Sequence, residues 1–293
     1  MNKLPKPYFQ SNGITLYHGD AREIAEQIGM VDMIFTDPPF GHGQNDRDLF
    51  ASRAKWRGKK PNRKIANDGP EANDLARWLF DFAARRLRCC CCCCCCGGGG
   101  GPDLQFARWS LWMDERLEFK QMIVWDKGPM GMGWHYRRSY ENVLVAQKGK
   151  GKCHWYDTTH KIENIIRPGA HGIRKIIPQK TDHPTPKPVA LPRLFIGLHT
   201  KPGDLVFDPF AGGGSTLVAA AQLRRRAIGV ELEERWCEMA ARKIEQEGAF
   251  DAAPPRARVS RTLSTPQLRA KTSPRAPARK LNTVPRPTPT PVR

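Results

Sequence analysis

The stretch FDPFAGGGST, residues 207–216, connects an apolar segment before it to a segment after it in which small apolar residues recur at helical spacing. DLVFDPF (204–210) predicts a strand, and GGSTLVAAAQLRR (213–225) predicts a helix. Gly212 and Gly214 lie at the turn between them, where the lack of a side chain lets the backbone approach a ligand closely. Roughly 17 residues after Gly214, Glu231 ends the next predicted strand. An acid there can accept hydrogen bonds from ribose hydroxyls, so turn and acid together indicate a nucleoside-containing cofactor.

The alternation of strands and helices continues through the body of the chain. Periodicity predicts strands over 14–20, 31–40, 121–126, 141–147, 204–210 and 227–232. It predicts helices over 21–29, 71–88, 102–119, 187–200, 213–225 and 234–248. Such alternation is typical of an α/β protein with a doubly wound, mostly parallel sheet. Because only a loop joins 121–126 to 141–147, we expect one antiparallel edge.

Between two of the predicted helices lies CCCCCCCCGGGGG, residues 89–101. Neighbouring residues of a strand point to opposite faces, so adjacent cysteines cannot pair comfortably in disulfides. Zinc sites need gapped spacing to fold four thiolates around one ion, so we expect no metal. We interpret the cysteines as a strand buried on both faces and the glycines as the turn that follows. A low-complexity expansion that still folds is the open alternative.

The chain of 293 residues has a net charge of +19, which favours a polyanionic partner such as nucleic acid. A basic tail on an otherwise ordinary protein would also explain this charge. We expect a mobile basic loop over 41–70 and a disordered, basic, Pro-rich tail over 251–293. The candidate DNA-binding residues are Arg53, Lys55, Arg57, Lys59, Lys60, Arg137 and Arg138. A solvated charged face is the alternative for the loop.

Membrane and export signals are not apparent in the sequence. No apolar run approaches the ~18 residues of a membrane span, and MNKLPKPYFQ (1–10) lacks the apolar core of a signal peptide. We therefore expect an intracellular, cytoplasmic protein that has no membrane partner.

A second motif, TDPPF (36–40), follows the strand predicted over 31–40. Its two prolines forbid a helix and give the chain a rigid, extended exit from the strand. That rigidity would hold the Asp37 carboxylate, the Pro38 carbonyl and the Phe40 ring in a constant relation. Two acceptors beside an aromatic plane suit an exocyclic amine on a flat base. A structural turn with a capping Asp is the alternative.

DPPF, DPFAGGGST and HPTPKP (183–188) resemble the motifs of the amino-group DNA methyltransferases that use S-adenosylmethionine. Their order, with DPPF first, resembles the circularly permuted beta class, and the resemblance covers about residues 12–247. It implies a Rossmann-like methyltransferase domain over 12–247, with target recognition in 148–182. The catalytic residues it implies are Asp37, Pro38, Pro39 and Phe40. The cofactor-binding residues it implies are Asp20, Ala21, Asp37, His183, Thr185, Lys187, Asp208, Phe210, Ala211, Gly212, Gly214, Ser215, Thr216, Glu231 and Leu232.

The resemblance implies methyl transfer to a base that is flipped out of double-stranded DNA. In the family, Asp at the first position of DPPF is usual for adenine N6 and Ser for cytosine N4, so we favour adenine. N4-cytosine methylation, RNA methylation and a non-catalytic DNA-binding relative stay open, as do a homodimer and a cognate restriction nuclease. A nicotinamide dehydrogenase would share the glycine turn and the acid, but it leaves DPPF and the basic loop unexplained. The chain departs from the family before the cysteine run, where RRLR replaces a KPGG-like turn.

Overall fold

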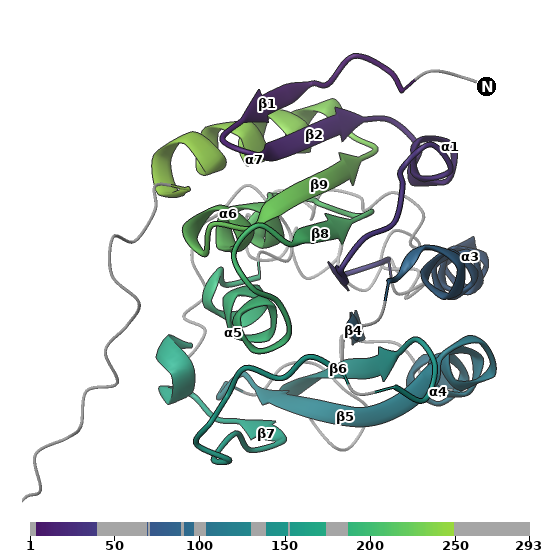
Figure 1. Ribbon diagram of the computed structural model, residues 1–293, viewed down its shortest axis with the longest axis vertical. Coiled ribbons are helices and arrows are strands. Elements are labelled where there is room, and N and C mark those ends of the chain that lie inside the picture. Colours follow the sequence, from purple (N-terminus) through teal and green to yellow (C-terminus); the bar gives the residue numbers. More distant parts are fainter. Residues whose placement is uncertain are drawn as a thin grey trace, which may run out of the picture. The chain divides into compact units, whose positions relative to one another are not determined.

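The computed structural model describes residues 4–39, 69, 71–88, 91–96, 104–129, 139–151, 153–173 and 187–248. Within them the chain forms a single nine-stranded sheet with helices on both faces (Figure 1). Most of 41–70, parts of 148–182 and all of 251–293 lie outside the described residues, so the expectations for these segments remain predictions. No helix in the described ranges is both long enough and apolar enough to cross a membrane.

The sheet has a parallel centre and antiparallel flanks. In spatial order its strands are β1 (Phe9–Ser11), β2 (Ile14–His18), β9 (Arg226–Glu231), β8 (Leu205–Asp208), β3 (Met33–Thr36), β4 (Cys91–Cys96), β6 (Tyr140–Gln147), β5 (Glu118–Asp126) and β7 (Ile165–Ile166). Neighbours from β2 to β4 are parallel, whereas β6 runs antiparallel to both β4 and β5. The antiparallel pair predicted from 121–126 and 141–147 is confirmed. It does not form the edge, however, because β7 pairs in parallel with β5 outside it.

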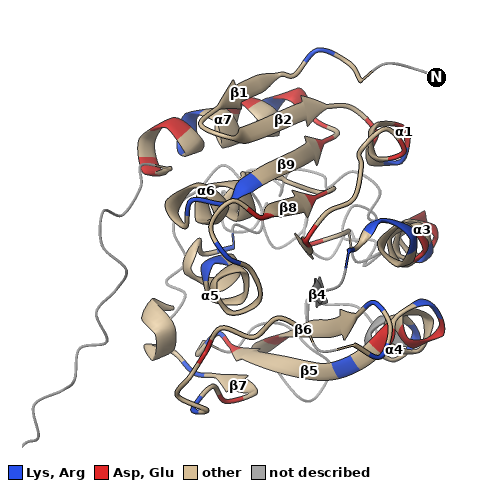
Figure 2. Cartoon of the chain, viewed as in Figure 1, with Lys and Arg blue, Asp and Glu red and all other residues tan. Residues whose placement is uncertain are grey.

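Each face of the sheet carries three of the α-helices within the described ranges. One face packs against α1 (Ala21–Ala25), α3 (Glu71–Arg86) and α4 (Leu104–Arg116). The other packs against α5 (Ala190–His199), α6 (Ser215–Gln222) and α7 (Glu234–Glu247), and η1 (Ala170–Gly172) contacts α5. Basic and acidic residues both occur along α3 and α7 (Figure 2), consistent with their amphipathic sequences.

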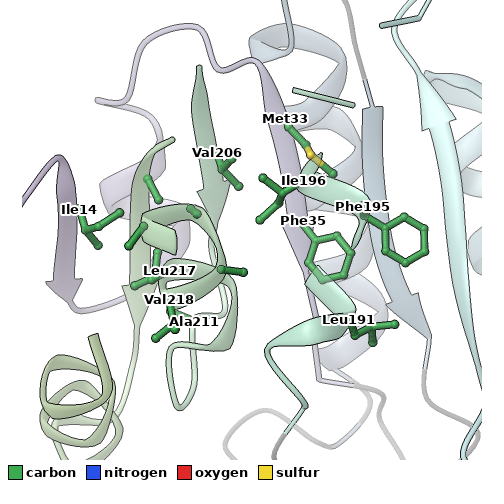
Figure 3. Close-up of a cluster of buried hydrophobic side chains, with 14 of the residues drawn as sticks. Ile14, Met33, Phe35, Leu191, Phe195, Ile196, Val206, Ala211, Leu217 and Val218 are labelled. Atoms are coloured by element: carbon green, nitrogen blue, oxygen red, sulfur yellow. The ribbon is translucent and has the colours of Figure 1, made fainter. Parts of the chain in front are cut away.

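The two apolar cores follow from this layering. On the α5–α7 face, Phe35 of β3 contacts Phe195 of α5, with ring centroids 5.4 Å apart, and Leu217 and Val218 bring α6 into the same cluster (Figure 3). On the opposite face, Phe82 of α3 packs on Phe207 of β8. Complete burial of each such side chain contributes about 1.5–3 kcal/mol. The strand ends that carry the motifs are thus held by packing on both faces.

The cysteine run supplies a central strand. Its backbone pairs in parallel with β3, where Cys93 lies opposite Phe35, and antiparallel with β6, where Cys94 lies opposite Leu144. The predicted strand is therefore confirmed for Cys91–Cys96. Among the residues that the structure describes, no group of three or more His, Cys, Asp or Glu side chains could hold a metal ion.

The order of the strands creates a topological switch point between β3 and β8. From β3 the chain crosses through α3 to β4, and from β8 it crosses through α6 to β9, on the opposite side. Because β3 and β8 are neighbours, their two connections diverge at the carboxyl ends of these strands. In open α/β sheets, ligands bind at such a switch point. Both motifs quoted above begin there.

Candidate active site

Asp208 and Thr36 join the two motifs at the switch point. Thr36, the last residue of β3, donates a hydrogen bond from Oγ1 to Asp208 Oδ1 over 2.7 Å, and both residues are buried. The same carboxyl oxygen accepts the Phe210 backbone N–H over 3.1 Å, and the Thr216 side chain also hydrogen-bonds this carboxyl. Burial raises the pKa of Asp208 to about 6, although these hydrogen bonds oppose the shift. Asp208 therefore organises the glycine loop from within.

This raised pKa predicts how the stability of the protein changes with pH. The folded state keeps the Asp208 proton up to about pH 6, whereas an unfolded Asp loses it near pH 3.9. Asp208 therefore lowers the free energy of unfolding progressively as the pH rises through this window. We expect the Asp208→Asn variant to lack that decline, which in the native protein lowers the free energy of unfolding by on the order of 2 kcal/mol at pH 7. Urea unfolding of both proteins at pH 4.5 and 7 checks this, and parallel pH profiles would contradict it.

The glycine loop turns sharply and is tied to β9. Gly212 and Gly214 adopt φ of 49° and 78°, in the left-handed region that favours glycine. A Cβ on Gly214 would lie 2.8 Å from Ala240 Cβ of α7, so a side chain there would also clash. The Gly212 N–H donates to Glu231 Oε2 over 2.8 Å, and the Ala211 N–H donates to the Val230 carbonyl over 2.9 Å. The loop is thereby held against the end of the neighbouring strand.

Glu231 lies where the sequence places it, at the end of β9. Its second oxygen accepts the Glu233 N–H over 2.9 Å, and burial raises the pKa of this carboxyl. Each carboxylate oxygen has two acceptor positions, so capacity for hydroxyl donors remains beside the loop. The next residue, Leu232, leaves 41% of its surface exposed. An acceptor and an exposed aliphatic side chain thus lie next to the glycine turn, an arrangement that fits a nucleoside.

Asp20 and Ala21 lie at the same edge of the sheet. The Gly19 N–H donates to the Glu231 carbonyl over 2.9 Å, which brings the end of β2 to the end of β9. Asp20 is the N-cap of α1: it accepts the Arg22 N–H over 2.8 Å and forms an ion pair with the Arg22 guanidinium. Arg22 holds the pKa of Asp20 below its ordinary value. Ala21 is buried in the first turn of α1.

Asp37 directly follows β3, and its two carboxylate oxygens have different surroundings. Oδ2 forms an ion pair with Lys187 Nζ at 2.6 Å. Oδ1 is shielded from water and has no hydrogen-bond partner within the described part of the chain. Burial raises the pKa of Asp37, and the Lys187 ammonium opposes that shift. A buried acceptor without a donor is costly, so this oxygen is suited to a donor brought by a ligand.

Lys187 links Asp37 to the glycine loop. The resemblance places it at the cofactor pocket; in the structure its ammonium contacts Asp37 and also Glu141 Oε2, at 3.2 Å. Its backbone carbonyl accepts a hydrogen bond from Ser215 Oγ, at the start of α6, over 2.7 Å. Lys243 Nζ donates to the same hydroxyl over 3.2 Å. The residue is therefore packed between both motifs.

Two charged residues of this site were missed in the sequence. Glu141, in β6, forms an ion pair with Lys127 over 2.7 Å besides its contact with Lys187. Burial would raise the pKa of Glu141, but the two ammonium groups outweigh it and hold the pKa below its ordinary value. The available signal was an acid at the start of the apolar run ENVLVAQ (141–147), which we interpreted only as a strand. An acid that precedes a buried run is common at strand ends, so the pattern alone was uninformative.

The other predicted residues fall into two groups. Pro38 is buried, Pro39 is partly buried, and the Phe210 ring packs edge-on to Trp78 with centroids 6.3 Å apart. Phe210 therefore contributes to the wall behind the loop. Outside the described residues lie Phe40, Arg53, Lys55, Arg57, Lys59, Lys60, Arg137, Arg138, His183 and Thr185.

Fold and site together define a Rossmann-like α/β protein in which a glycine turn and a strand-end acid lie at the same strand ends as the partly buried Asp37 carboxylate. The family model described as DNA methylase, for N6 and N4 methyltransferases, matches residues 31–242. The chain belongs to this family of amino-group DNA methyltransferases and uses S-adenosylmethionine as its cofactor.

Several known proteins are similar to it over most of their length. DNA adenine methyltransferase YhdJ of Escherichia coli (strain K12) is 25% identical over 275 residues, which cover 83% of this chain and 87% of that protein. Type II methyltransferase M2.DpnII of Streptococcus pneumoniae is 25% identical over 261 residues, which cover 83% and 94%. The crystal structure of the M1.HpyAVI–SAM complex matches with a TM-score of 0.54 at 27% identity, over 78% of this chain and 99% of that one. The cytosine-N4-specific PvuII DNA methyltransferase shares the fold, with a TM-score of 0.57 at 18% identity over 80% and 88% of the two chains.

Proposed function

We propose that this enzyme methylates the exocyclic N6 amine of an adenine that is flipped out of double-stranded DNA. The observation that carries the proposal is Asp37 Oδ1, a buried acceptor without a partner in the described chain, at the carboxyl end of β3. An amine supplies the N–H donor that this oxygen lacks. A base must leave the duplex to bring its amine into such a site.

The chain's own groups account for the positioning of the reactants. S-adenosylmethionine supplies a methyl group on a positively charged sulfur, which is electrophilic enough to need no strong base. The glycine loop lets the cofactor approach the backbone, and Glu231 accepts its ribose hydroxyls. Asp20 then lies near its adenine or amino end, as the family resemblance implies, and Leu232 also contacts it. These roles would hold the methyl group near the carboxyl ends of β3 and β8.

Asp37 has the central role toward the base. Its Oδ1 and the Pro38 carbonyl accept hydrogen bonds from the amine, which turns the nitrogen lone pair toward the methyl group. As the N–C bond forms and the S–C bond breaks, positive charge grows on the nitrogen, and the carboxylate stabilises it. The surplus amine proton then leaves to Asp37 Oδ1 or to water. Phe40, the next residue but one after Pro38, provides a ring on which the base stacks.

The preference for adenine over cytosine is supported by Asp37 at the head of DPPF. It is also supported by a relative that is named a DNA adenine methyltransferase and is 25% identical. DNA contact is assigned to the basic loop 41–70 and to Arg137 and Arg138, and target recognition to 148–182 in the domain 12–247. The basic tail 251–293 would act as a nonspecific tether, so its removal would make the salt dependence of DNA binding shallower.

The product of the reaction tests this proposal. We expect purified enzyme to transfer labelled methyl from S-adenosylmethionine to unmethylated duplex DNA, with the label in N6-methyladenine after digestion to nucleosides. Label in N4-methylcytosine would overturn the choice of base but keep the amino-group chemistry. Label on RNA and not on DNA would overturn the substrate class.

A further inference from the structure

We propose that Glu141 and Lys127 are positioning residues of the active site, which act through Lys187 to orient Asp37 and to balance the charge near the transferred methyl group. This inference deepens the proposed function, and its orienting part depends on that function. Its charge-balancing part depends only on cofactor binding.

The four residues form a line of alternating charge. Lys127 Nζ lies 2.7 Å from Glu141 Oε1, Glu141 Oε2 lies 3.2 Å from Lys187 Nζ, and Lys187 Nζ lies 2.6 Å from Asp37 Oδ2. Lys127 directly follows β5, Glu141 belongs to β6, Asp37 directly follows β3, and Lys187 precedes α5. Elements far apart in the sequence thus contribute to one cluster, which lies beyond the carboxyl ends of β3 and β5.

Burial makes these contacts consequential. The side chains of Lys187 and Glu141 are each only 11% exposed, so water screens their charges poorly. Lys127 is 31% exposed and connects the cluster to solvent. A buried charge requires compensation, and within the line each inner residue has an opposite charge on both sides.

The orienting role follows from which Asp37 oxygen is used. Lys187 contacts Oδ2 and leaves Oδ1 without a partner in the described chain. Lysine has a flexible stem, so a single contact would let its ammonium move from one carboxylate oxygen to the other. Glu141 Oε2 lies 3.2 Å from the same ammonium, an ion-pair contact without hydrogen-bond geometry. With two carboxylates to satisfy, Lys187 stays on Oδ2 and does not compete with the substrate amine for Oδ1.

The balancing role follows from the charges. The charges of the two carboxylates and the two ammonium groups sum to zero. The cofactor sulfur is positive, and it must lie close to Asp37, because its methyl group passes to the amine that Asp37 binds. Glu141→Gln leaves the cluster with one surplus positive charge, and Lys127→Gln leaves it with one surplus negative charge. A unit charge about 10 Å away, at an effective dielectric constant of about 20, changes an affinity by on the order of tenfold.

The test compares two ligands that differ in charge at sulfur. Titration calorimetry without DNA measures the dissociation constants of cationic S-adenosylmethionine and neutral S-adenosylhomocysteine. We expect Glu141→Gln to weaken the binding of S-adenosylmethionine, relative to that of S-adenosylhomocysteine, by on the order of tenfold. We expect Lys127→Gln to shift the same ratio in the opposite direction, by less because Lys127 is farther along the line and more exposed. Glu238→Gln, which removes an exposed acid paired with Arg242 on α7, is the matched control and should leave the ratio unchanged.

A general loss of structure would not produce ratio shifts of opposite sign. Shifts of the same sign in both variants, or no shift in either, would overturn the balancing role. The orienting role predicts a lower kcat for Glu141→Gln on DNA with little change in the KM for DNA, and an unchanged kcat would overturn it. Because the ligand ratio is measured without DNA, it remains informative even if the methylated base proves to be cytosine.

Discussion

Replacement of Asp37 by asparagine is expected to lower the rate of methyl transfer by on the order of 10²–10³-fold at saturating cofactor. The asparagine amide has one oxygen and one NH₂ group. If its oxygen takes the Oδ2 position beside Lys187, the NH₂ group faces the substrate amine, and two donors oppose each other. If it turns the other way, its NH₂ group faces the Lys187 ammonium, which lies 2.6 Å from the native oxygen. Neither orientation satisfies both neighbours, and the charge that stabilises the developing ammonium is lost.

Single-turnover transfer of labelled methyl to DNA measures this effect. The affinity for S-adenosylhomocysteine should be retained, because the proposed role of Asp37 is toward the amine and the ligand is neutral at sulfur. Asp81→Asn, which changes an exposed acid of α3 paired with Arg116, is the matched control and should keep full activity. An Asp37→Asn enzyme with more than a tenth of the native rate would contradict the role of Asp37.

Replacement of Lys187 by methionine is expected to destabilise the protein by about 3–5 kcal/mol near pH 8. The change removes the ammonium that Asp37 and Glu141 share and leaves a buried and a partly buried carboxylate close together. Burial already raises the pKa of Asp37, and loss of Lys187 raises it further, because this ammonium opposes the shift. A carboxyl whose folded pKa exceeds its unfolded pKa costs stability increasingly as the pH rises between the two values. The deficit should therefore be smaller at pH 5 than at pH 8.

Urea unfolding of the native protein and the variant at both pH values measures this difference. Lys120→Met is the matched control, because Lys120 pairs with Glu118 at a half-exposed position, where such a pair contributes at most about 1 kcal/mol. A deficit in Lys187→Met that is equally large at pH 5 and pH 8 would show that lost packing, and not uncompensated charge, causes it.

Local sequence patterns predicted most of the regular structure. Apolar spacing identified α3, α4, α5, α6 and α7 and the strands from β2 to β9 apart from β7. Even the cysteine run was correctly interpreted as a strand, because small apolar residues between two helices have few alternatives. The errors concern short elements and the ends of longer ones: the strand predicted over 31–40 ends at Thr36, and residues 118–119, predicted as helix, begin β5. β1 and β7 have three and two residues, too few to show a period, and α1 ends at Ala25, short of the predicted 29.

The site was predicted in part. The positions of Asp37, Glu231 and the glycines at the strand ends were predicted because a proline pair, a glycine turn and an acid at constant spacing are signals contained within short segments; their roles stay predictions. The contact between Thr36 and Asp208 spans 172 positions in sequence, and its existence depends on the pairing of β3 with β8. The network of Glu141 and Lys127 depends likewise on the antiparallel register of β5 and β6, in which Trp125 lies opposite Glu141.

Neighbours along the chain were enough to predict the class of fold, the glycine turn with its acid, and Asp37 as the candidate for the amine. The ion pair of Lys187 with Asp37, the cluster completed by Glu141 and Lys127, and the Asp37 oxygen without a partner in the described chain became visible only in three dimensions. The physical reason is that charge compensation in a buried site acts through space over a few ångströms. Its partners are chosen by strand order and register, which no local pattern contains.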